Sequence, residues 1–170
     1  MHSEEDSMSA PQGYSRAQIA LHWIVAVLII PQFLFNDAIG AAFHAAQNAE
    51  PIAFNAAAPL HIITGVAILV IVIWRMVLRF SRGAPAPVPT ANPMMTKIAA
   101  SVQHTMYLVL ILMVVSGGMA RFGGVGFAAG VHGALALVLA LLILIHVAGA
   151  VKQQFVEKTG VIARMMKAAD

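Results

Sequence analysis

The stretch FAAGVHGALALVLALLILIHVAGAV, residues 127–151, decides the fold of this chain. It contains no charged side chain, and a helix of this length crosses a hydrocarbon layer about 30 Å thick. His132 and His146 are fourteen residues apart in it. That spacing places both rings nearly on one helix face, about 21 Å apart along the axis. Because an ionisable residue at membrane depth is costly, both histidines are candidates for a functional site.

Three further apolar stretches are long enough to span a membrane, namely residues 18–35, 60–77 and 98–119. The chain has 170 residues, of which 60% are hydrophobic and only 10% are charged. This composition indicates an integral membrane protein with one compact domain. We therefore expect an all-α, four-helix transmembrane bundle over residues 14–155. A disordered N-terminal tail (1–13) should precede it, and a cytoplasmic C-terminal tail (156–170) should follow it.

The distribution of charge predicts how the bundle is oriented. Nine of the ten Lys and Arg residues fall on one set of helix ends, and only Arg121 falls on the other. This positive-inside bias predicts a multi-pass protein of the bacterial inner membrane with both termini cytoplasmic. It also excludes a nucleic-acid partner, although the pI is near 9.7. The basic residues are expected to contact lipid head groups of the bilayer or carboxylates of a cofactor.

Local signals predict where three of the helices begin. Ser15 and Gln18 have the spacing of a capping box, in which two side chains satisfy free backbone groups of the first turn. Pro59 is expected in the first turn of the second helix. Asn92 and Pro93 are expected to cap and begin the third.

Other signals predict interruptions. Pro31 should kink the first helix because it lacks a backbone N–H. Residues 36–58 are Ala-rich with few charges, and we expect them to form an outer loop, while 121–126 should form a second, glycine-rich one. The fourth helix is expected to continue past Lys152 and to break at Gly160.

Five histidines lie at membrane depth, and four of them form two depth-matched pairs. His22 begins the first segment, so it should share a level with His146; His61 begins the returning second segment, so it should share a level with His132. Two neutral imidazoles on opposite faces of an iron are the ligands that a b-type haem requires, and each ring needs its other nitrogen hydrogen-bonded. The pattern therefore predicts two haems, each bound as a metal centre by one pair.

The chain has no cysteine, so any haem must be held non-covalently. Gly65, Gly133 and Gly149 lie near the histidines and leave room for a flat cofactor. Arg75 and Arg79, one turn apart, could neutralise the propionates of the inner haem.

His104 lies in the cytoplasmic half of the third segment, outside the two pairs. It could compete with His22 or His146 as a ligand, bind a quinone or a propionate, or simply hold two helices together by a hydrogen bond. The last interpretation applies to any single membrane histidine. Extended to the whole set, it predicts a structural or transport bundle without a cofactor.

The segments YSRAQIALHW (14–23), HIITGVAILVIVIWRMVLRF (61–80), HTMYLVLILMVVSG (104–117) and IHVAGAV with KTGVIARMM (145–151 and 158–166) together resemble bacterial cytochrome b561. That family is similar in architecture to the cytochrome b subunits of membrane hydrogenases and formate dehydrogenases. The resemblance implies ligands from the first, second and fourth helices, which are His22, His61, His132 and His146 here.

The resemblance also implies electron transfer between a periplasmic or membrane donor and ubiquinone, and one member of the family is a superoxide:quinone oxidoreductase. This chain carries Gln153 and Gln154 where that member has histidines, and its outer loops hold Arg121 against Asp37 and Glu50. A collector of superoxide should instead focus the anion with positive charge. The expected function is electron transfer from a periplasmic donor to the quinone pool. The alternatives are a superoxide oxidase and a cytochrome b anchor subunit of a periplasmic dehydrogenase.

Overall fold

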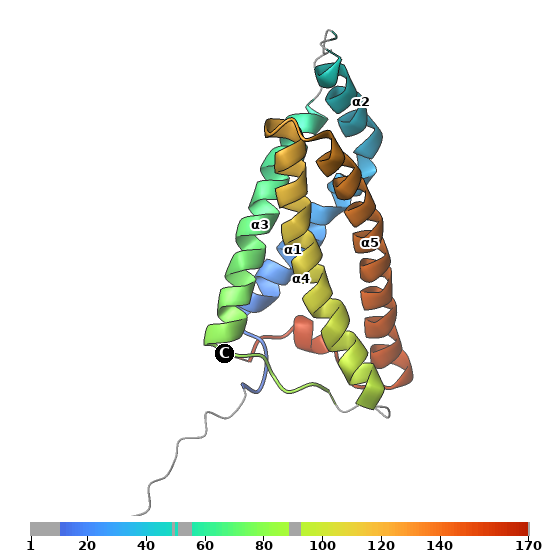
Figure 1. The fold of residues 1–170 in the computed structure, drawn as a ribbon. Coiled ribbons are helices and arrows are strands. Elements are labelled where there is room, and N and C mark those ends of the chain that lie inside the picture. Colours follow the sequence, from blue (N-terminus) through green and yellow to red (C-terminus); the bar gives the residue numbers. More distant parts are fainter. Residues whose placement is uncertain (1–10, 49, 51–55, 89–92, 170) are drawn as a thin grey trace, which may run out of the picture.

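The computed structural model describes residues 11–48, 50, 56–88 and 93–169, and in these residues the fold is all-helical. Four long helices run between the same two ends of the molecule (Figure 1): α1 (Arg16–Leu34), α3 (Ala57–Ser81), α4 (Pro93–Phe122) and α5 (Gly126–Val151). All four are long and apolar enough to cross a membrane. The predicted all-α membrane bundle is therefore confirmed.

The outer surface of the bundle is apolar, as a lipid-facing surface must be. Large side chains such as Phe80, Leu137 and Leu144 are more than two-thirds exposed. In water such a surface would cause aggregation, whereas in a bilayer it faces hydrocarbon chains. The exposed surface of the fold is therefore suited to contact with lipid.

The core is small and contains side chains from all four long helices. Val72 of α3 is the most deeply buried, with 1% of its surface exposed. Buried around it are Val25, Ile29, Ile68, Val109, Leu110 and Leu139. Helix α1 packs along α3, α3 along α4, and α4 along α5. This order brings α1 and α3 to different parts of α5.

The prediction of a loop over residues 36–58 was wrong in its first half, which forms helix α2 (Asn36–Gln47). The sequence NDAIGAAFHAAQ is rich in Ala, the residue with the highest helix propensity. Asp37 lies in its first turn, where its negative charge complements the helix dipole. Pro31 lies inside α1, and the boundary between α1 and α2 falls at Phe35, four residues later.

The end of α5 agrees with the sequence analysis. It continues into a π-helix (Lys152–Val156), and the chain then turns at Gly160, whose φ of +70° suits a residue without a side chain. A short 3₁₀ helix (Ala163–Met165) follows. Of the other predicted starts, Pro59 lies in the first turn of α3, and α4 begins at Pro93. Asn92 lies outside the described residues.

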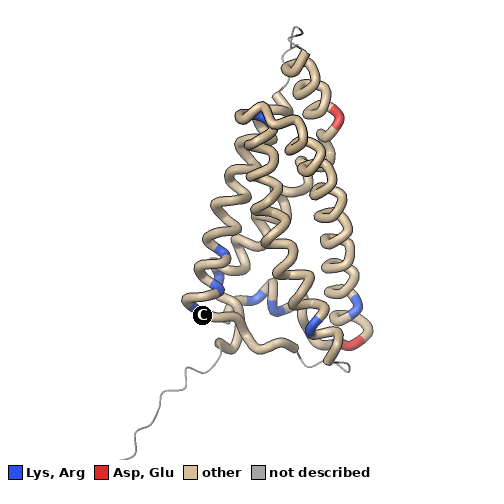
Figure 2. Tube along the Cα trace, viewed as in Figure 1, with Lys and Arg blue, Asp and Glu red and all other residues tan. Residues whose placement is uncertain are grey.

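Basic residues gather at the end of the molecule that contains both described termini (Figure 2). We call this the basic end; it holds Arg16, Arg75, Arg79, Arg82, Lys97, Lys152, Lys158, Arg164 and Lys167. The backbone N–H of Ala169 donates to the carbonyl of Tyr14 over 3.1 Å, and Arg164 Nη1 donates to the carbonyl of Ala86 over 3.0 Å. The C-terminal tail is thus fastened across the start of α1 and the loop after α3.

Pro11 also belongs to this end, since its ring lies close to Gly83. Residues 1–10 of the predicted N-terminal tail lie outside the described residues. The division of the chain into a central domain and two tails stays a prediction.

The predicted capping box is present, and it also ties α1 to the loop after α3. Ser15 Oγ accepts from the Gln18 N–H over 3.2 Å, and Gln18 Oε1 accepts from the Ser15 N–H over 3.0 Å. Gln18 Nε2 donates to the carbonyl of Gly83 over 3.0 Å. Both side chains are buried. One glutamine therefore satisfies two backbone groups in two elements.

Replacing Gln18 with Ala should destabilise the protein by about 1–3 kcal/mol, because the buried N–H of Ser15 and the half-buried carbonyl of Gly83 lose their partner. The measurement is thermal or denaturant unfolding of the purified protein in detergent. The matched control is Gln47→Ala, at the exposed end of α2, which should change stability by no more than about 0.5 kcal/mol. Equal effects of the two substitutions would contradict this role of Gln18.

Candidate functional site

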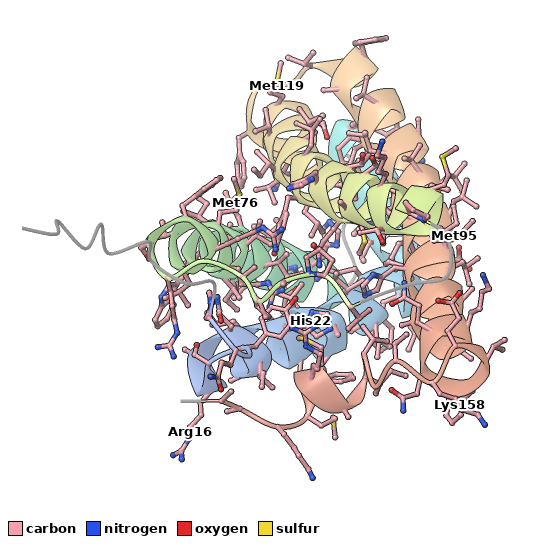
Figure 3. The ribbon with its side chains drawn as sticks, turned by 90° about the horizontal axis from the view of Figure 1, so that it is seen from below. Arg16, His22, Met76, Met95, Met119 and Lys158 are labelled. Carbon is pink, nitrogen blue, oxygen red and sulfur yellow. The ribbon has the colours of Figure 1, made fainter. Side chains whose placement is uncertain are left out.

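Four of the five membrane-depth histidines meet in two pairs inside the bundle. The ring centres of His22 on α1 and His146 on α5 are 6.2 Å apart, and we call these two residues the basic-end pair. The ring centres of His61 on α3 and His132 on α5 are 5.9 Å apart, and we call these the far pair. Viewed from the basic end, His22 lies toward the middle of the bundle, while Arg16 and Lys158 project at its rim (Figure 3).

The spacing within each pair suits a shared metal ion. A bond between a metal and an imidazole nitrogen is about 2 Å long, so two imidazoles on opposite sides of one ion have ring centres about 6 Å apart. The two rings are inclined by 59° in the basic-end pair and by 77° in the far pair. All four side chains are half-buried.

His132 is held by α4, which contributes no histidine to either pair. Its Nδ1 lies 2.9 Å from the carbonyl oxygen of Met113 and 3.4 Å from Oγ of Ser116. A carbonyl can only accept, so Nδ1 carries the proton and Nε2 is left with a free lone pair. That is the tautomer that a metal-binding histidine with a hydrogen-bonded second nitrogen requires.

His61 has a buried Nδ1 that bonds to no described residue. An unsatisfied buried nitrogen costs about 1–3 kcal/mol, and a ligand that bonds to it removes this cost. The backbone of His61 is fixed by Thr64, whose Oγ1 donates to the carbonyls of Leu60 and His61 and accepts from Gln32 Nε2 on α1. The backbone of His61 is therefore fixed, and its Nδ1 has no partner among the described residues.

The basic-end pair lies beside a guanidinium that connects three helices. Arg75 on α3 donates through Nη1 to the carbonyl of Gln18 on α1 over 3.0 Å. Its Nη2 lies 3.4 Å from Nδ1 of His22 and 3.4 Å from the hydroxyl of Tyr107 on α4. A permanent positive charge thus lies next to this pair, where it can neutralise an anionic group of a ligand.

The C-terminal tail bonds to Trp23, which packs against His22 of the basic-end pair. The indole of Trp23 packs edge-on against His22 with ring centres 5.3 Å apart. Its Nε1 donates to the carbonyl of Met165 over 2.8 Å. The tail therefore holds the aromatic ring that covers His22.

His104 and Arg79 lie apart from both pairs, together in a pocket of about 190 Å³ between α3 and α4. Tyr107 belongs to the same pocket, so its hydroxyl connects the pocket to Arg75 and His22. Arg75 lies beside His22, whereas Arg79 lines this pocket, so the expectation that both neutralise propionates of the inner haem stays a prediction. The other residues that line the pocket are Met76, Phe80, Leu108 and Ile111.

Small residues leave space near the histidines. A methyl group added at Gly65, Gly133 or Gly149 would meet no described atom within 4 Å. At Gly117 the opposite holds, because an added methyl carbon would lie 3.1 Å from Cε1 and Nδ1 of His132. Gly117 therefore permits a close approach of α4 to the far pair.

Four residues of α4 were not predicted from the sequence: Met113, Ser116 and Gly117, which contact His132, and Tyr107, which contacts Arg75. A signal was present, because a Ser-Gly-Gly run inside an apolar span marks a place of close helix approach. Gln32 and Thr64, two polar residues at membrane depth, were a second signal.

The chain is similar to known proteins over nearly its whole length. The family model described as prokaryotic cytochrome b561 matches residues 13–168. A curated relative is cytochrome b562 of Cereibacter sphaeroides, which is 35% identical over 161 residues. The alignment covers 94% of this chain and 99% of the relative.

The site agrees chemically with the cofactor of such proteins. Haem b is held non-covalently by histidine, and the structure offers paired imidazoles at a suitable spacing, an unsatisfied ring nitrogen at His61 and a cation at Arg75. The arrangement fits a haem-binding membrane protein that transfers electrons. The chain belongs to the prokaryotic cytochrome b561 family.

Proposed function

We propose that the protein holds two haem b groups, one in each histidine pair, and passes electrons between a periplasmic donor and the quinone pool. The observation that supports this most strongly is the pair of histidines on α5, each of which meets a histidine from a different helix at about 6 Å. His22 and His146 would hold one haem, and His61 and His132 the other. When bound, haem supplies an iron that takes up and releases one electron.

The interior between the two pairs favours the transfer of electrons over the conduction of ions. Residues 134–145 of α5 are all apolar, and Leu139 among them is buried in the core beside Ile68 and Val72. A conducted ion needs polar groups or water along its path, whereas an electron does not. The dry core therefore supports electron transfer and argues against a transport bundle.

The charge distribution supports the orientation of the protein in the bacterial inner membrane. With nine of the ten basic residues at the basic end, the positive-inside rule puts that end and both termini in the cytoplasm. The far pair would then face the periplasm and receive electrons there. Arg75, beside the basic-end pair, would neutralise a propionate of the inner haem.

The pocket of His104 supports quinone exchange at the basic end. An imidazole, a phenol and a guanidinium, from His104, Tyr107 and Arg79, lie in it among apolar side chains. A quinone ring has two carbonyls that accept hydrogen bonds and an apolar body, which match these donors and this lining. Tyr107 and Arg75 lead from the pocket to His22.

The nature of the donor separates the main proposal from a superoxide oxidase. A superoxide oxidase would need positive charge at the far end to attract the anion, and Arg121 is the single basic residue there, with Asp37 at the same end. A protein donor makes no such demand. An anchor subunit of a periplasmic dehydrogenase would use the same internal path, so we keep a donor protein as the proposal.

The purified protein should contain two haem b groups per chain. A pyridine haemochrome assay against protein concentration measures this ratio. Acid–acetone should extract all of the haem, because the chain has no cysteine that could bind it covalently. One haem per chain, or none, would refute the assignment of two pairs.

Substitutions in one pair should remove the same haem. His22→Ala and His146→Ala should each lose the haem of the basic-end pair, while His61→Ala and His132→Ala should each lose the other, because an iron with one protein ligand is poorly held. The measurement is haem content with a redox titration that identifies the haem that remains. His44→Ala, on α2, is the control and should keep both. If His22→Ala and His61→Ala removed the same haem, the pairing would be wrong.

His104→Ala should keep both haems but slow the reduction of a soluble quinone by about two- to tenfold. Loss of one hydrogen bond of about 0.5–1.5 kcal/mol accounts for this range. Stopped-flow kinetics of haem oxidation by the quinone measure the rate, again with His44→Ala as the control. A lost haem would make His104 a ligand, and unchanged kinetics would remove it from the quinone site.

A further inference from the structure

Helix α4 contributes no histidine to either pair, yet it touches His132 at three neighbouring positions. The Met113 carbonyl lies 2.9 Å from Nδ1, and Ser116 Oγ lies 3.4 Å from the same atom. Gly117 lies against the ring edge, since a methyl carbon there would be 3.1 Å from Cε1 and Nδ1. Ser116 is also buried, with 6% of its surface exposed. Together these groups contact the ring on its Nδ1 side.

The contacts differ in kind from those of the other paired histidines. Nδ1 of His22 faces the guanidinium of Arg75, and Nδ1 of His61 has no partner among the described residues. Among the contacts described for the paired histidines, a carbonyl accepts from the ring at His132, which fixes its tautomer. A hydrogen bond of this kind makes the other nitrogen a more basic ligand.

We propose that Met113, Ser116 and Gly117 form a positioning site on α4 that sets the orientation of His132 and, through it, the reduction potential of the haem in the far pair. The inference rests on the proposed function, in which His132 binds haem. Ser116 and Gly117 are positioning residues, because they act through His132. A more basic ligand stabilises ferric iron, so a weaker contact with the Met113 carbonyl should raise the potential of that haem.

The chain contains a matched pair of glycines for testing this inference. Gly117 is in contact with His132, whereas a methyl group at the adjacent Gly118 would meet no described atom within 4 Å. Both lie in α4, so Gly→Ala has the same effect on helix propensity at each. Any difference between Gly117→Ala and Gly118→Ala therefore reports the contact with the histidine.

The experiment uses the full-length, haem-loaded protein and measures haem content, potentiometric titration and EPR spectra. Gly117→Ala should change the equilibrium constant for reduction of the far-pair haem at least threefold. At 59 mV per factor of ten, this raises its reduction potential by about 30 mV. It should also change the anisotropy of that haem's low-spin EPR signal, because this signal depends on the angle between the two ligand rings. The other haem should keep its potential and spectrum. Gly118→Ala should leave both haems unchanged.

Serine variants provide a second test with a smaller change of side-chain volume at the contact. Ser116 Oγ donates to the Leu112 carbonyl over 2.7 Å, and Ser81 Oγ donates in the same way to the Val77 carbonyl over 2.8 Å. Both Ser→Ala variants lose a bond to the carbonyl four residues earlier, but Ser116 Oγ also donates to the Met113 carbonyl over 3.2 Å and lies next to His132. Ser116→Ala should therefore shift the potential of the far-pair haem, by less than Gly117→Ala, and Ser81→Ala should shift neither haem.

The outcomes separate two possible failures. If the wild type carries fewer than two haems, the proposed function fails before any titration is made. If it carries two haems, and Gly117→Ala matches Gly118→Ala in potential and spectrum, the positioning site is refuted. Loss of only the far-pair haem in Gly117→Ala supports it, because His132 has then been displaced. If Gly117→Ala does not fold, the Ser116→Ala variant tests the inference instead. In that case, a spectrum and a reduction potential equal to those of Ser81→Ala refute the inference.

Discussion

The meeting of the two α5 histidines with histidines on two different helices is the constraint on which the bundle depends. An imidazole is costly in hydrocarbon unless it bonds to something, so His132 and His146 each require a partner at their own depth. Helix α1 brings His22 to His146, and α3 brings His61 to His132. Helix α1 also packs along α3, and α4 along α5.

The two pairs differ in their electrostatic surroundings, although they are built from the same residue type. At the basic-end pair the nearest polar group is the permanently charged guanidinium of Arg75. At the far pair it is the carbonyl of Met113, which presents the negative end of a dipole. In a low-dielectric interior both effects are larger than in water. The helix that supplies each polar group is therefore as important to the site as the helices that supply the histidines.

The sequence was sufficient to predict the four spans and which histidines lie close together. These depend on hydropathy and on the helical rise of 1.5 Å per residue, which are properties of single segments. Helix α2 was missed because the charge content of its segment was interpreted as that of a loop, although its alanines favour a helix. The contacts of Ser116 and Gly117 were missed for a different reason. The Ser-Gly-Gly run marks a place of close approach on α4, but which residue it meets is decided by tertiary packing.

The small core has a consequence for how such a bundle is held together. Helices in lipid gain no hydrophobic driving force from meeting one another, so close packing and a few polar contacts must hold them. Here Arg75 joins α1, α3 and α4, while Gln32 and Thr64 join α1 to α3. Each histidine pair joins α5 to one of the two helices that lack extensive direct packing against it. A haem bound between two histidines would make that junction a coordination bond, and by mass action a ligand that binds only the folded protein stabilises it. Cofactor binding and helix assembly would then be one equilibrium, in which the histidines that carry the redox chemistry also fasten α5 to α1 and α3.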